Sequence, residues 1–143
     1  MYSKVKRFLG MILALAMAIA LSVPAFAATH ASDYFALTDV KITRTSGGNF
    51  TVEFDINATD NMQELGAKEI VIYEQQDDGS YEDVKTFTRY NTSGLIDTDA
   101  DFAYGKVTYK GTVGTKYYAT VALYAKDASG SETLYCDTKI ITA

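Results

Sequence analysis

Apolar and polar residues alternate along much of the chain after residue 33. A period of two sends neighbouring side chains to opposite faces of a β-strand, so this pattern predicts strands with one dry and one wet face. The longest such stretch is 117–126, and its apolar positions, which we expect to face the core, are Tyr117, Ala119, Val121, Leu123 and Ala125. The stretch 50–58 repeats the pattern, and its apolar positions are Phe50, Val52, Phe54, Ile56 and Ala58.

Turn signals divide the chain into seven predicted strands, which cover residues 35–43, 50–58, 67–75, 81–88, 102–109, 117–126 and 133–142. The Asp-Gly pair at 78–79 is a strong signal for a hairpin between two of them. We expect the polar segment 59–66 to be a loop or one short helical turn, and 89–101 to be a connecting loop or a sheet crossover. The first strand is expected to kink or bulge near residues 38–39. Short strands at intervals of about 8–12 residues favour an all-β, seven-stranded antiparallel β-sandwich, with a barrel as the alternative.

The start of the chain has the pattern of an export signal. Three basic residues within 4–7 precede an almost wholly apolar run at 8–23, Pro24 ends that run, and an A-x-A motif follows at 25–27. The run nearly reaches membrane-spanning length, so an anchor is the alternative, but a proline followed by small residues favours cleavage. The sequence therefore predicts a signal peptide over residues 1–27 and one secreted domain over residues 28–143, with no membrane attachment after cleavage.

Charge limits the partners of this domain. Residues 28–143 hold ten basic and 18 acidic residues, which gives a net charge of −8. Such a surface repels nucleic acid and anionic lipid, because both bind to basic faces. The sequence therefore favours a protein or a glycan as the partner.

The chain has one cysteine and one histidine. Cys136 has no second cysteine to pair with, and we expect a buried thiol beside Leu134; an outward-facing thiol would instead link two chains. His30 lies in a predicted loose terminus. A Ser-His-Asp or Cys-His catalytic set needs a histidine held by packing, so no catalytic residues are predicted.

Residues 114–131 combine a Gly-bounded turn, an alternating strand and a Ser-Gly turn. The residues concerned are Gly114-Thr115-Lys116-Tyr117, then Ala119, Val121 and Leu123, then Asp127-Ala128-Ser129-Gly130-Ser131. This arrangement resembles strand F and the F–G turn of fibronectin type III domains. In that family and the wider immunoglobulin-like superfamily, a tyrosine at the start of strand F hydrogen-bonds back across the sandwich. Tyr117 matches this position, and Tyr118 is the second choice.

The resemblance implies an immunoglobulin-like, fibronectin type III-like sandwich. The early-strand Trp of fibronectin type III and the paired cysteines of antibody domains are absent from this sequence. An Arg-Gly-Asp motif is absent too, so the resemblance does not imply integrin binding. The chain as a whole also resembles small secreted proteins of Gram-positive bacteria.

Three alternate carboxylates, Asp97, Asp99 and Asp101, resemble the start of a calcium loop. Alternate carboxylates can converge on one hard cation, so calcium is the candidate cofactor. An EF-hand also needs Gly at its sixth and Glu at its twelfth position, where this chain has Phe102 and Thr108. The sequence therefore predicts a solvated loop and no required cofactor, with a calcium site of another kind at these three residues as the second prediction.

Three tyrosines, Tyr104, Tyr118 and Tyr124, are predicted to lie on an outer sheet face. Exposed aromatic rings can stack on sugar rings, so these residues are the candidate binding site. Packing of tyrosines across neighbouring strands is the commoner role of such residues, and sugar binding is the alternative.

These patterns favour a non-enzymatic binding module with a protein or cell-surface partner. A carbohydrate-binding module, assisted by calcium, is the alternative. A small hydrolase with paired carboxylates is disfavoured, because 116 residues of β-sandwich leave little room for a cleft that positions two acids and a substrate.

Overall fold

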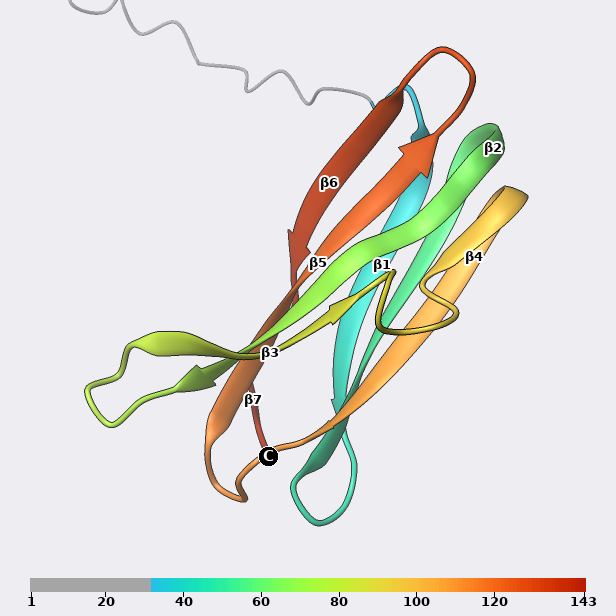
Figure 1. Cartoon of the computed structure of the whole chain (residues 1–143). Coiled ribbons are helices and arrows are strands. Elements are labelled where there is room, and N and C mark those ends of the chain that lie inside the picture. The colour runs from blue at the N-terminus through green and yellow to red at the C-terminus, as the bar shows by residue number, and fades with distance from the viewer. Residues whose placement is uncertain (1–31) are drawn as a thin grey trace, which may run out of the picture. The chain divides into compact units, whose positions relative to one another are not determined.

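The computed structural model describes residues 32–143, so the predicted signal peptide and His30 lie outside the described residues. Within residues 32–143 the chain forms seven antiparallel strands and no helix, which confirms the all-β prediction (Figure 1). The strands are β1 (Phe35–Arg44), β2 (Asn49–Gln75), β3 (Tyr81–Thr88), β4 (Ile96–Lys110), β5 (Lys116–Lys126), β6 (Ser131–Asp137) and β7 (Ile141–Thr142). A search of this range for a helix apolar and long enough to cross a membrane finds none.

The long strand β2 organises the sheet, because it pairs with four other strands. Its first part, 49–57, lies between β1 and β4. Residues 64–66 lie between β4 and β5, and residues 69–75 lie beside β3, with β5 on the other side. β6 pairs with the far edge of β5, and the short β7 pairs with the start of β5. All seven strands therefore belong to one hydrogen-bonded sheet, which curls into a half-barrel around the core (Figure 1).

Two predicted loops are partly strand. The segment 59–66 continues β2, and 96–101 is the first part of β4, so these loop predictions are wrong. The sequence pattern fails here because the register between β2 and β4 shifts between Asn57 and Met62. That shift interrupts the two-residue period. Pairing on both sides, with β4 and β5, then holds this polar segment extended.

Gly66 lets another part of the chain approach β2 closely. Its φ is +150°, and a Cβ built on it would lie 2.0 Å from the carbonyl oxygen of Leu95. That same oxygen accepts a hydrogen bond of 2.7 Å from the nitrogen of Ala67. Only glycine fits this position, because any side chain would overlap backbone atoms.

The core contains the residues that the alternation predicted. Tyr117, Ala119, Val121, Leu123 and Ala125 of β5 are fully buried, and the apolar side of residues 50–56 is at most 1% exposed. The opposite face of β5 departs from the prediction, because Ala122 and Tyr124 are also buried. The outer face of β5 is therefore partly shielded from solvent.

The last predicted strand, 133–142, is two strands. β6 ends at Asp137 and β7 begins at Ile141. The change falls at Thr138, whose nitrogen donates to the Ala119 carbonyl and whose Oγ1 accepts from the Ala119 nitrogen at 3.0 Å. The side chain of Thr138 thus takes the place of a backbone acceptor in the ladder, and the chain turns away. The irregularity of β1 lies between Phe35 and Leu37, slightly before the predicted kink.

Tyr117 joins β5 to the preceding turn and to β2. Its hydroxyl oxygen accepts a hydrogen bond of 2.9 Å from the nitrogen of Thr112, and its proton is donated to a carboxylate oxygen of Glu74. Burial, and then the hydrogen bond to Glu74, raises the pKa of Tyr117. Gly111 leaves room for the ring, since a Cβ there would lie 2.7 Å from it. The hydrogen bond back to an earlier residue is therefore made by Tyr117, not Tyr118.

Candidate functional site

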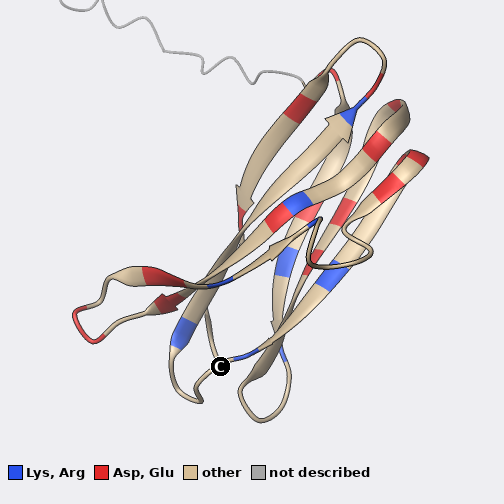
Figure 2. Cartoon of the chain, in the orientation of Figure 1, with Lys and Arg blue, Asp and Glu red and all other residues tan. Residues whose placement is uncertain are grey.

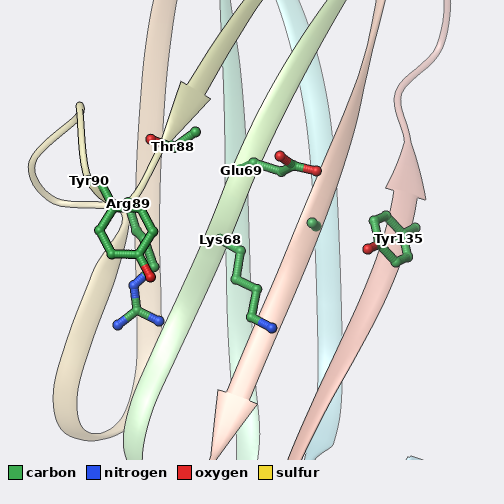
Figure 3. Close-up of a pocket in the computed structure, with 7 residues that line it drawn as sticks. Lys68, Glu69, Thr88, Arg89, Tyr90 and Tyr135 are labelled. Carbon is green, nitrogen blue, oxygen red and sulfur yellow. The ribbon is translucent and has the colours of Figure 1, made fainter.

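A shallow pocket of about 340 Å³ opens on the outer face of the sheet (Figure 3). Its lining comes from β2, the end of β3 and the turn after it, β5, and β6. The residues are Lys68, Glu69, Thr88, Arg89, Tyr90, Ala122 and Tyr135. In Figure 3, Arg89 and Tyr90 stand on one side, Tyr135 stands on the other, and Lys68 and Glu69 extend between them. This volume is at the small end of the roughly 300–1,000 Å³ of ligand sites.

A β-bulge in β2 builds the centre of the pocket. The register between β2 and β5 shifts between Ala67, which faces Leu123, and Glu69, which faces Ala122. The extra residue is Lys68, and a bulge of this kind re-aims side chains. As a result both Lys68 and Glu69 line the pocket, although they are neighbours in a strand.

Two cations lie against the ring of Tyr124 beside the pocket. The Lys68 ammonium lies 4.1 Å from the ring centroid, and the Arg89 guanidinium lies 5.7 Å from it. Such contacts stabilise a cation over an aromatic face. They also explain why Tyr124 is only 7% exposed on an outer face.

Arg89 is fixed from a second side by Glu64. Its Nη1 donates to a carboxylate oxygen of Glu64 at 2.9 Å. This hydrogen bond is the main reason why the pKa of Glu64 lies below its ordinary value and the pKa of Arg89 lies above its own. The contacts to Tyr124 and Glu64 together hold one wall of the pocket in place.

The two walls of the pocket carry exposed tyrosines. Tyr90 is 90% exposed and Tyr135 is 68% exposed. None of the ring–ring contacts within residues 32–143 involves either of them. Their rings are therefore accessible to a ligand.

Neither of these tyrosines is among the binding residues predicted from the sequence. Tyr135 had a usable signal, because it alternates with Leu134 and Cys136 and so had to face away from the core. The sequence signal for Tyr90 was weaker, since it was only an aromatic residue within a polar turn. Their meeting across β2 and β5 depends on the pairing of strands, which the local pattern does not contain.

The predicted tyrosines do not form one platform. Tyr104 is 43% exposed on β4, where its hydroxyl donates to Glu53 at 2.9 Å. Tyr118 stacks on Tyr73, with ring centroids 4.8 Å apart, and the edge of Tyr81 meets it as well. Cross-strand packing thus accounts for Tyr118. Tyr124, beneath the two cations, is the one that adjoins the pocket.

The three predicted calcium ligands are exposed on the first part of β4. Asp99 has a φ of +53°, in the left-handed region. Among the residues of the described domain, no three acidic, histidine or cysteine side chains lie close enough together to hold a metal ion. The calcium site at Asp97, Asp99 and Asp101 therefore stays a prediction that is tested below.

Cys136 is half-buried on β6 and packs against the core, together with Leu134. Burial, and then the charge of Asp137, raises the pKa of the Cys136 thiol. A thiol of this kind is poorly nucleophilic, because the thiolate is the reactive form.

Comparisons with known proteins find little likeness. No family model matches the chain, and no curated protein matches it. Among solved structures, it is similar to the solution structure of a protein assigned to the late embryogenesis abundant (LEA) group. The two share 10% sequence identity with a TM-score of 0.44, over 76% of this chain and 72% of the other.

Proposed function

We propose that residues 28–143 form a non-enzymatic binding module, whose partner, a protein or a glycan, contacts the pocket between Tyr90 and Tyr135. The observation that carries this proposal is the exposure of both tyrosines on opposite walls of one pocket. Exposed apolar surface within a depression marks an interaction site more often than an accident of packing.

The wall of the pocket that Arg89 forms supports the same proposal. Arg89 is tied to Glu64 and to the ring of Tyr124, so it is ordered before a ligand arrives. A preorganised site loses less conformational entropy on binding than a mobile one. Binding to this module therefore requires little rearrangement of the backbone.

We also propose that the curled sheet corresponds to an immunoglobulin-like, fibronectin type III-like sandwich. In such domains strands A, B and E belong to one layer, and strands C, F and G to the other. The pairings support this assignment. β1, the first half of β2, and β4 would be A, B and E, while the second half of β2, β5 and β6 would be C, F and G. The hydrogen bond that the Thr112 nitrogen donates to the Tyr117 hydroxyl would correspond to the family's tyrosine corner.

The setting proposed for this module is outside the cell. That proposal rests on the basic, apolar and A-x-A pattern of residues 1–27, which is typical of a signal peptide. The net charge of −8 over residues 28–143 makes nucleic acid and anionic membranes unsuitable partners.

Amide-resolved NMR on the full-length chain tests the binding proposal. The probes are a set of small fragments that includes amino acids, short peptides and monosaccharides. We expect the shifts to cluster at Lys68, Ala122 and Tyr135. The matched variant is Ala122→Gln, which fills the floor of the pocket and should remove these shifts. Shifts that survive this substitution, or that appear elsewhere on the sheet, would contradict the proposal.

A further inference from the structure

We infer that the ligand of the pocket is an uncharged glycan, with sugar rings that contact Tyr90 and Tyr135. This inference rests on the proposed binding function and specifies its ligand. A pyranose ring has an apolar face of C–H groups and a rim of hydroxyls. A site for it therefore needs exposed aromatic faces together with hydrogen-bonding groups.

The aromatic faces are present and exposed, although the Arg89 guanidinium lies over one face of the Tyr90 ring, 5.7 Å from its centroid. Tyr90 and Tyr135 have no aromatic partner within residues 32–143, whereas Tyr118 is engaged with Tyr73 and Tyr81. A tyrosine ring offers a large, rigid contact area at a low cost in conformational entropy. Thr88 pairs with Glu69, Glu69 with Ala122, and Ala122 with Tyr135, so the two walls stand three strand spacings, about 14 Å, apart. A glycan of several sugar rings can therefore contact both tyrosines.

The hydrogen-bonding groups come from the bulge of β2. Because Lys68 and Glu69 both line the pocket, a donor and an acceptor extend from adjacent residues between the tyrosines (Figure 3). The Lys68 ammonium contacts the ring of Tyr124 but has no carboxylate oxygen within 4 Å among the residues described, so its N–H donors that do not face the ring can bond to a ligand. Adjacent hydroxyls of a sugar can accept from one group and donate to the other, in charge-assisted hydrogen bonds.

The charge of the pocket points to an uncharged ligand. Lys68 and Glu69 carry opposite charges, and the Arg89 guanidinium is already paired with Glu64. The charges therefore cancel at the pocket, while acidic residues predominate over the rest of the domain (Figure 2). An anionic ligand would meet the carboxylate of Glu69 and the negative field of the whole domain.

Calorimetry and amide-resolved NMR on the full-length chain test this inference. The probes are four neutral trisaccharides, namely cellotriose, maltotriose, mannotriose and triacetylchitotriose, and the acidic trigalacturonic acid. We expect at least one neutral probe to bind and to shift the amides of the pocket. Tyr135→Ala should weaken that binding roughly tenfold, through the loss of one stacking face. The matched control is Tyr104→Ala, which removes an exposed tyrosine of β4 and should leave binding unchanged.

A second pair of variants tests the polar groups. Lys68→Met should weaken binding of the neutral probe several-fold, because it removes the donor but keeps the stem. Lys106→Met removes an exposed lysine from β4 and should have no effect. Circular dichroism confirms that each variant folds.

The outcomes separate the inference from the proposed function. Tighter binding of trigalacturonic acid than of every neutral probe would overturn the uncharged ligand and leave the binding function intact. If no sugar binds while peptide fragments still shift the pocket amides, the glycan is wrong and the binding module stands. If neither sugars nor other fragments shift the pocket amides, the glycan inference and the proposed binding function are both wrong. A neutral probe that binds Tyr135→Ala as well as the original chain would overturn the placement of the sugar ring.

Discussion

The hydroxyl of Tyr117 accepts a hydrogen bond of 2.9 Å from the backbone nitrogen of Thr112, five residues earlier in the chain. The ring of Tyr117 is fully buried and lies 5.0 Å from that of Phe50, between ring centroids. One side chain thus connects the turn between β4 and β5 to the core and, through Glu74, to β2. This connection makes the tyrosine hydroxyl a contributor to stability that can be isolated by a single substitution.

Tyr117→Phe keeps the buried ring and removes that hydroxyl. We expect the free energy of unfolding to fall by about 1–3 kcal/mol, because the Thr112 nitrogen loses its acceptor in a partly buried place. Urea unfolding followed by circular dichroism measures the change. Tyr104→Phe is the control, since its hydroxyl bonds Glu53 at the surface, and it should leave stability nearly unchanged. Equal losses for the two variants would contradict a structural role of the Tyr117 hydroxyl.

Gly66 and Gly94 form a matched pair for a test of close approach. Both have a positive φ, but a Cβ on Gly94 would meet nothing within 4 Å, whereas one on Gly66 would overlap Leu95. Gly94→Ala should cost about 1–2 kcal/mol from backbone strain alone. Gly66→Ala should cost clearly more, beyond about 3 kcal/mol, or prevent folding. If the two substitutions shift the urea midpoint equally, the contact between Leu95 and β2 is not as close as described.

The ion pair of Glu64 and Arg89 predicts a pH dependence. The hydrogen bond and charge of Arg89 hold the pKa of Glu64 in the folded chain below its ordinary value of 4.5. The pair therefore stabilises the fold above pH 4.5, and this contribution is lost as the pH falls through the lowered pKa. Because both side chains are partly exposed, the contribution should not exceed about 1 kcal/mol.

Glu64→Gln provides the measurement of this effect. Its urea midpoint should lie below that of the original chain at neutral pH, and the difference should disappear as the pH falls through the lowered pKa of Glu64, because the carboxyl is then protonated in both states. Glu82→Gln is the control, since Glu82 takes part in neither of the two ion pairs found in residues 32–143. A difference that grows on acidification would show that the sign is wrong.

Calcium should leave the thermal midpoint unchanged. Asp97, Asp99 and Asp101 are exposed in an extended strand, where their carboxylates are not gathered around one point. Melting curves with millimolar calcium and with a chelator make the comparison, and a triple Asp→Asn variant shows whether any shift comes from these residues. A rise of the midpoint that the triple variant abolishes would establish the site predicted from the sequence.

The sequence predicted well those features that depend on alternation within one strand. The burial of Val121 and Leu123 follows from a period of two in a strand that runs without interruption. The β2–β3 hairpin follows from Asp78 and Gly79, whose turn preferences are local. In both cases the physical cause lies within a few residues of its effect.

The features that the sequence did not predict depend on contacts between distant strands. Segment 59–66 looks like a loop because it is polar, and it becomes a strand because β4 and β5 pair with it on either side. Tyr124 looks exposed, and it is covered by Lys68 and Arg89, which come from other strands or turns. The candidate pocket has the same origin. Its two exposed tyrosines come from the turn after β3 and from β6, and the pairing of the strands between them places them opposite each other.

The continuity of β2 determines how the domain unfolds. Residues 49–57 and 64–75 are one uninterrupted backbone that forms ladders with β1, β4, β3 and β5. Neither half can be released without loosening the ladder that crosses the shared stretch between them. We therefore expect the amide protons of both halves to exchange with solvent through the same global opening event, as a single cooperative unit.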